Sequence, residues 1–305
     1  MRRLLWPIAV AAAGLTYASV YEVRAFTLRR VTVPVLAPGS APLKVLHLSD
    51  THMTPGQHKK QRWLRGLADL QPDLVINTGD NLAHMDAVPS VLAAYGDLLD
   101  LPGAFVFGSN DYFSPTMRNP AGYLTGGTGI DSGGEWVRAR DMPFEDLRSA
   151  FTQRGWTDLS NRHDTHEIGD RRLALVGVDD PHLNFDQLDD APADRTADLT
   201  IGVAHAPYLR VLDRWNTLGY ELIMAGHTHG GQLCLPFLGA LVTNCDLDRA
   251  RAKGLHTHQV PGHDPSWLHV SAGLGTSPYT PVRFACRPEA TLLTLTGIGL
   301  SGSHI

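Results

Sequence analysis

Seven residues whose side chains can bind metal ions recur in five short motifs along this 305-residue chain. The motifs combine carboxylates, one carboxamide and imidazoles, and none of them contains a cysteine. Hard oxygen donors together with imidazole nitrogens suit divalent Mn, Fe or Zn, whereas iron–sulfur clusters and Cys-rich structural zinc sites need thiolates. The motifs therefore predict a site for divalent cations with the following ligands: Asp50, His52, Asp80, Asn110, His205, His227 and His229.

Each motif follows a short apolar run that is typical of a buried strand, about four to eight residues long and bounded by Gly, Asp or Pro. In α/β sheets the crevice outside the carboxyl ends of the strands is where ligands bind. Five strand ends at one such edge would bring the seven side chains together. The predicted strands are 44–49, 73–77, 104–107, 199–203 and 221–224.

The order of the motifs resembles that of the calcineurin-like metallophosphoesterases. The motifs are Asp50-Thr51-His52, Gly79-Asp80, Gly108-Ser109-Asn110-Asp111, His205 and Gly226-His227-Thr228-His229. The last motif, continued to Gln232, is similar to the membrane-associated bacterial branch of the family. The resemblance covers roughly residues 43–295. It implies an α/β fold, a four-layer αββα sandwich, and two divalent metal ions, with Mn, Fe and Zn as the candidates.

The resemblance also implies how the ligands are shared. The implied ligands of the first ion are Asp50, His52 and His229, and those of the second are His205 and His227. Asp80 would bridge both ions, and an amide oxygen would complete the second. Two ions about 3.5–4 Å apart bind phosphate oxygens and activate a water molecule. The predicted function is hydrolysis of a phosphomonoester or phosphodiester; the alternative is a non-catalytic metal-binding scaffold.

The third motif departs from the family pattern, which reads Gly-Asn-His-Asp or Gly-Asn-His-Glu, with Asn as ligand and His as proton donor. An ungapped alignment makes Ser109 the ligand and puts Asn110 in the His position. We favour Asn110 as ligand through a one-residue shift, because a carboxamide oxygen binds these ions better than a neutral hydroxyl does. Catalytic roles are predicted for Asn110, Asp111 and His84, the last as a replacement acid. A good leaving group would need no acid.

Composition indicates a globular chain of the size of an enzyme rather than a disordered or nucleic-acid-binding chain. Apolar residues make up 43% of the sequence and charged residues 19%, which argues against disorder. The formal net charge of −5 offers no general attraction to nucleic acid, so no nucleic-acid partner is expected. The three cysteines are expected to be buried thiols, with a Cys234–Cys245 bridge as the alternative.

The N-terminal 25 residues form a separate segment. Residues 4–21 carry no charge and follow two arginines, which predicts a single uncleaved N-terminal membrane helix. A cleaved signal, giving a secreted protein, and a buried helix are the alternatives. With an anchor, the phosphoester substrate would be met at a membrane surface, and a lipid or envelope-derived substrate is the candidate. The side of the membrane stays open.

The rest of the chain is expected to form one domain. Residues 26–42 predict a linker and edge strand, since Pro34 is tolerated only at a sheet edge. Residues 43–300 predict the metallophosphoesterase domain, with helices over 57–70 and 87–99 and further strands after His229 that complete a second sheet. Residues 113–142 lack periodicity and predict a lid or insertion loop at the mouth of the site.

Overall fold

The computed structural model describes residue 10 and residues 12–116, 139–235 and 237–299. Two six-stranded mixed sheets make up its centre, ordered β1-β14-β2-β3-β4-β5 and β12-β13-β9-β8-β7-β6. The strands of the first sheet are β1 (Thr27–Leu36), β14 (Glu289–Gly297), β2 (Leu43–Leu48), β3 (Leu74–Asn77), β4 (Gly103–Phe105) and β5 (Thr157–Asp158). Those of the second are β12 (Gly254–His258), β13 (Ser266–Val270), β9 (Leu222–Ala225), β8 (Leu199–Val203), β7 (Arg171–Gly177) and β6 (Arg162–Ile168). A two-stranded hairpin pairs β10 (Cys234–Leu235) with β11 (Gly239–Ala240).

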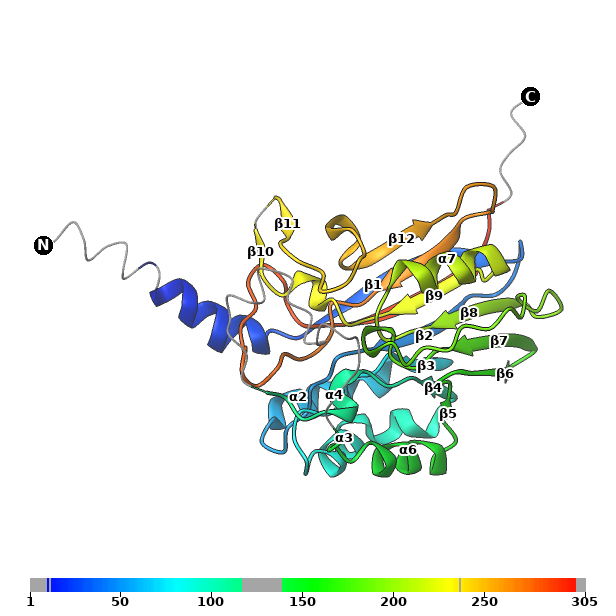
Figure 1. Cartoon of the computed structure of the whole chain (residues 1–305). Coiled ribbons are helices and arrows are strands. Elements are labelled where there is room, and N and C mark those ends of the chain that lie inside the picture. Colours follow the sequence, from blue (N-terminus) through cyan, green and yellow to red (C-terminus); the bar gives the residue numbers. More distant parts are fainter. Residues whose placement is uncertain (1–9, 11, 117–138, 236, 300–305) are drawn as a thin grey trace, which may run out of the picture.

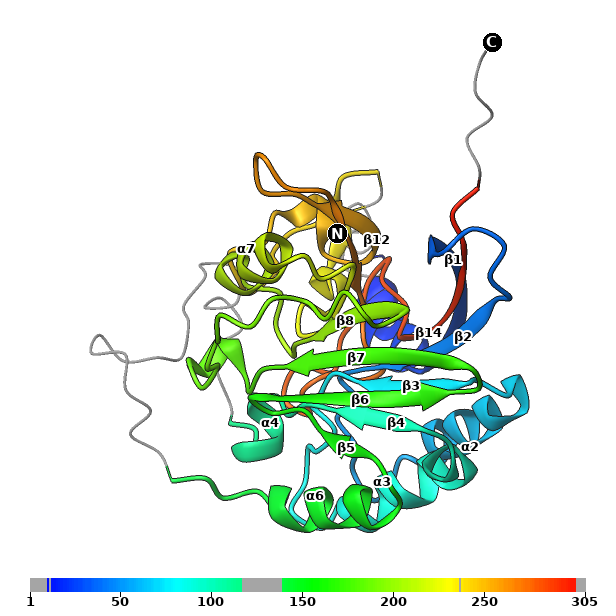
Figure 2. The ribbon, with the colours of Figure 1, turned by 90° about the vertical axis from the view of Figure 1, so that its right-hand side faces the viewer.

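Helices cover the outer face of each sheet, and the two sheets face each other (Figure 1). The helices on the first sheet are α2 (His58–Arg65), α3 (Val88–Tyr95) and α6 (Phe144–Gln153), below the sheets in Figure 2. The second sheet packs against α7 (Leu209–Leu218). A further short helix, α4 (Ser109–Tyr112), begins at the third motif. The predicted four-layer αββα sandwich is confirmed.

Alternating residues of the central strands serve two different apolar cores. In β2, Leu46 and Leu48 pack toward α2 and α3, while Val45 packs between the sheets. Strands that are buried on both faces read as continuous apolar runs, which is why the sequence shows no alternation there. Rigid strands on either side of the intersheet core therefore carry the motifs.

The predicted elements are found, with three differences. Both predicted helices finish as 3-10 turns, Gly66–Leu70 and Gly96–Asp100. β14 joins the first sheet rather than the second, because it pairs with β1 on one side and β2 on the other. The sequence analysis did not identify β5 in the first sheet, nor β6, β7 and β12, which complete the second sheet.

The prediction of a single N-terminal membrane helix is wrong. Among the helices of the described residues, none combines the length and apolarity needed to cross a bilayer. The segment instead forms a π-helical turn at Tyr17–Tyr21, where Ala18 is buried. The buried Glu22 accepts a hydrogen bond from the Cys286 backbone amide at 2.6 Å, and the carbonyl of Ala18 accepts one from the Arg283 amide at 3.0 Å.

Two further predictions concern loops and thiols. Most of the predicted lid at 113–142 lies outside the described residues, which break off at 116 and resume at 139. Cys234, Cys245 and Cys286 are free thiols, so the alternative of a Cys234–Cys245 bridge is not realised. The predicted edge strand is confirmed, because β1 lies at the edge of the first sheet. At an edge, a proline such as Pro34 can be accommodated although it has no backbone N–H to donate.

Candidate metal centre

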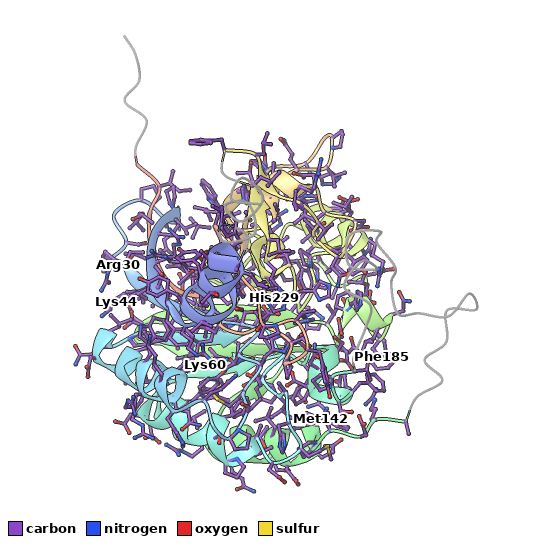
Figure 3. The ribbon with its side chains drawn as sticks, turned by 90° about the vertical axis from the view of Figure 1, so that its left-hand side faces the viewer. Arg30, Lys44, Lys60, Met142, Phe185 and His229 are labelled. Carbon is purple, nitrogen blue, oxygen red and sulfur yellow. The ribbon has the colours of Figure 1, made fainter. Side chains whose placement is uncertain are left out.

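Five of the seven predicted ligands have a left-handed backbone, which is uncommon for residues other than glycine. Their φ angles lie between 41° and 67°, and the residues are Asp50, His52, Asp80, His227 and His229. Such conformations cost of order 1–3 kcal/mol each and gather where a site needs them. The loops after the strands are thus bent to aim these side chains at one place, and Figure 3 shows His229 near the middle of the molecule.

Four ligands form a compact buried group, in which the ligand atoms of Asp50, His52, Asp80 and His229 all lie within 4.8 Å of one another. The Nε2 atoms of His52 and His229 are 3.2 Å apart. Asp80 Oδ2 lies 3.5 Å from His52 Nε2, and Asp50 Oδ1 lies 3.6 Å from His229 Nε2. Two carboxylates and two imidazoles from three loops therefore converge on one point.

A second group lies on the other side of Asp80. His205 Nε2 is 3.6 Å from Asp80 Oδ2 and 3.2 Å from His227 Nδ1. The side-chain amide of Asn110 donates to Asp80 Oδ2 at 2.7 Å, and its backbone amide donates to Oδ1 at 2.8 Å. One carboxylate, Asp80, is thus shared by two groups of nitrogen and oxygen donors.

Backbone carbonyls fix the orientation of three imidazoles. His205 Nδ1 lies 2.7 Å from the Thr78 carbonyl and His229 Nδ1 lies 3.1 Å from that of Gly275. His227 Nε2 lies 3.2 Å from the carbonyl of Asn244. A histidine that gives one ring N–H to a carbonyl presents its other nitrogen as a free donor to a metal. In each ring that other nitrogen faces the cluster.

The electrostatics of the cluster suit a cation. Burial and the nearby Asp80 raise the pKa of Asp50 to about 8, and burial raises that of Asp80. Burial lowers the pKa values of His52 and His205 to about 4 each, and that of His227 to about 3. The imidazoles are therefore neutral, as ligands must be. Within the described residues, no Lys or Arg forms an ion pair with Asp50 or Asp80.

One further feature fits a bound divalent ion. Gly108 lies so close to Asp80 and His205 that any Cβ atom would overlap both side chains. A side chain there would fill the space between the shared carboxylate and its neighbour. The types of donor atom, the neutral imidazoles and this space all match the predicted ions.

The three predicted catalytic residues differ in their contacts and in their exposure to solvent. Asn110 contacts Asp80, as described above, whereas Ser109 Oγ lies 3.4 Å from the Asn110 amide nitrogen. Asp111 is fully buried and accepts hydrogen bonds from the backbone amides of Asn81, Leu82 and Gly108, so it ties the second motif to the third. His84 has a side chain that is 51% exposed and accepts from the Asp86 amide.

Two residues near the ligands, His182 and Lys60, were missed. The ring of His182 packs 4.5 Å from that of His227, and its Nδ1 lies 3.0 Å from the Tyr208 hydroxyl. His182 follows β7, so recognising that strand would have added a sixth strand end to the pattern. Lys60, labelled in Figure 3, is buried in α2 and donates to the carbonyl of Thr51 at 2.6 Å. No sequence signal marked it, since it reads as one cation of a surface helix.

A family model described as calcineurin-like phosphoesterase matches residues 43–231. The chain belongs to this family. The match includes every predicted ligand and both groups of the site, so this hydrolase carries a metallophosphoesterase domain with a divalent-metal site.

Relatives span most of the chain at low identity. An uncharacterized metallophosphoesterase of Bacillus subtilis, YkoQ, is 26% identical over 83% of this chain and 84% of its own length. The phosphodiesterase YaeI of Escherichia coli is 27% identical over 96% of this chain and 98% of its own. Among solved structures, TT1561 of Thermus thermophilus has a TM-score of 0.41 at 10% identity, covering 77% of this chain and 91% of that one.

Proposed function

We propose that this metallophosphoesterase hydrolyses phosphodiesters with two divalent cations, one on either side of Asp80. The observation that carries the proposal is the position of that carboxylate. Asp80 Oδ2 lies 3.5 Å from His52 Nε2 in one group and 3.6 Å from His205 Nε2 in the other. One carboxylate between two sets of donors is the arrangement that two ions need, because it offsets part of their mutual repulsion.

The residues of the two groups would share the work. One ion would be held by Asp50, His52 and His229, the other by His205, His227 and Asn110, and both by Asp80. When bound, such a pair acts as a Lewis acid toward a phosphate oxygen and lowers the pKa of water. The chain itself keeps its four imidazoles neutral by burial and fixes three of them with backbone carbonyls.

The diester is the first substrate class to test. YaeI, which matches 96% of this chain and 98% of its own length, is named a phosphodiesterase. A phosphomonoester is the competing class.

The test combines metal refilling with two substrates. The full chain is depleted of metal, refilled with Mn, Fe or Zn, and assayed on bis(p-nitrophenyl) phosphate and p-nitrophenyl phosphate. We expect two metals per chain, no turnover without metal, and faster turnover of the diester. Faster hydrolysis of the monoester would replace the substrate class, and a refilled protein without either activity would favour the non-catalytic scaffold.

A further inference from the structure

Two histidines lie where an apolar core is expected, in the space between the two sheets. His47 on β2 is 0% exposed and His269 on β13 is 1% exposed. They share their strand faces with Val45 and Trp267, which pack into the apolar cluster between the sheets. Burying a polar group costs free energy unless it is hydrogen-bonded, so the contacts of this pair are informative.

These contacts form an unbroken chain of hydrogen bonds to the metal centre. His269 Nδ1 lies 2.8 Å from His47 Nδ1, and His47 Nε2 lies 3.0 Å from Thr78 Oγ1. Thr78 Oγ1 donates to Ser49 Oγ at 2.6 Å, and Ser49 Oγ donates to Asp50 Oδ2 at 2.5 Å. All five residues are buried. The chain therefore links the intersheet core to a predicted ligand.

The carboxylate end fixes the direction of every bond in this chain. Asp50 as a metal ligand is ionised and only accepts, so the single proton of Ser49 points to it. The proton of Thr78 then points to Ser49, and the Thr78 oxygen accepts from His47 Nε2–H. Because a neutral imidazole carries one N–H, His47 Nδ1 must accept from His269 Nδ1–H. Each histidine has one allowed tautomer.

We infer that this one-way chain holds Asp50 in place for its metal ion, and that His47 and His269 are positioning residues of the metal centre. The inference rests on the metal site of the proposed function, but not on the substrate. The outer contacts of a metal ligand orient it and are worth about 10- to 100-fold in metal affinity or activity when they are lost. Here the contacts extend four residues beyond the ligand itself.

Three further features support a functional hydrogen-bond chain rather than two histidines that are buried by chance. Burial lowers the pKa of His269 to about 3 and that of His47 well below its usual value, so both rings are neutral. A Cβ atom on Gly226 would overlap the Ser49 hydroxyl, so the glycine of the last motif makes room for the chain. The carbonyl of Thr78 also orients His205, which links the chain to the second group.

The first experiment reads the tautomers directly. The full chain, labelled with ¹⁵N-histidine and loaded with Zn²⁺, is examined by long-range ¹H–¹⁵N correlation NMR. We expect His47 protonated at Nε2 and His269 protonated at Nδ1. Each ring is assigned from the signal that disappears in His47→Gln and His269→Asn. The opposite tautomers, or a charged ring, would overturn the inference.

The second experiment removes or keeps single donors. Asn places an amide N–H where His has Nδ1–H, and Gln places one where His has Nε2–H. Titration of metal-free protein with MnCl₂ should show a dissociation constant raised about tenfold in His269→Leu and in His47→Leu. In His269→Asn and His47→Gln we expect it within about twofold of wild type. His258→Leu, which removes a buried imidazole bonded to Asp213 at 2.7 Å elsewhere in the second sheet, is the matched control and should bind as wild type.

The outcomes separate positioning from mere packing. Equal loss of Mn²⁺ affinity in the Leu and amide variants, or no loss in either, would overturn the inference. If a Leu variant fails to fold, the tautomers of the wild-type protein still decide. If the wild-type chain binds no Mn²⁺ or Zn²⁺, the proposed function fails, and if it binds metal but cleaves no phosphoester, the inference stands alone.

Discussion

The two halves of the metal centre have different types of metal ligand. The first half, Asp50, His52 and His229, has a carboxylate of its own, held by the Ser49 hydroxyl and by the His227 backbone amide at 3.1 Å. The second half, His205, His227 and Asn110, has neutral donors alone and shares Asp80 with the first. In the proposed assignment, two carboxylates would face the first ion and one would face the second. The difference suggests a rule for such sites: the half with more negative charge should bind its metal ion with the higher affinity.

Support differs between the halves as well. Asp50 is reached by a chain of side chains from within the core, whereas His205 and His227 are fixed by the carbonyls of Thr78 and Asn244. Asn244 itself has a left-handed backbone in the segment between β11 and β12. We therefore expect the first ion to be bound tightly and the second more weakly. The predictions below test this contrast.

The largest effect is expected for the shared carboxylate. Asp80→Asn removes the charge that both halves use, so bound metal should fall at both positions and hydrolysis should drop to background. Metal content by atomic spectroscopy and turnover of bis(p-nitrophenyl) phosphate measure the two losses together. A variant with two metals per chain and normal turnover would show that Asp80 is not the bridge.

The contrast itself predicts stepwise metal loss. Dialysis of the loaded protein against rising chelator concentrations should remove one metal per chain before the other, with dissociation constants at least about tenfold apart, or about 1.4 kcal/mol. Asp50→Asn removes the extra carboxylate of the first half and should bring the two steps together. Loss of both metals in one step from the wild-type chain would contradict the difference between the halves.

A smaller loss, confined to the weaker ion, is expected from the third motif. Asn110→Ala withdraws a ligand of the second half and should empty that position while the first stays filled. The amide needs only a half-turn about its last bond to place oxygen where nitrogen now faces Asp80. Ser109→Ala is the matched control, because it loses at most a hydrogen bond of about 1 kcal/mol. The opposite ranking would make Ser109 the ligand.

Proton release on metal binding should come from carboxylates rather than imidazoles. In the metal-free protein the pKa of Asp50 is raised to about 8, so at pH 7 a bound cation must displace a proton there. The pKa values of His52 and His227, about 4 and 3, leave those rings without a proton to lose. Calorimetry in buffers of different ionisation enthalpy should show release at pH 7 that declines toward pH 9. Equal release at both values would show that another group supplies the proton.

The sequence predicted the metal ligands more readily than the residues that hold those ligands in position. All five predicted strands exist, because strands buried on both faces are apolar throughout and each ends in a polar motif. Support comes from residues whose partners are far away in the chain. His47 meets His269 across 222 positions, and Glu22 meets Cys286 across 264. No local pattern marks such a pair. The prediction for the N-terminal segment failed because it rested on apolar composition alone, whereas no helix of the described residues is both long and apolar enough to cross a bilayer.

The smallest effects concern the proton that the leaving group needs. No histidine occupies the acid position of the third motif, so aryl diesters, whose leaving groups are acidic, should be cleaved faster than alkyl diesters. His84 is half exposed and bonded to Asp86, so we expect His84→Ala to change the alkyl rate by less than about twofold, below what general acid catalysis contributes. Rates on a series of leaving groups of graded pKa, compared between the two proteins, measure this. If alkyl and aryl diesters react alike in wild type and His84→Ala slows the alkyl diesters alone, His84 is the acid after all, and the loop after β3 brings it to the substrate.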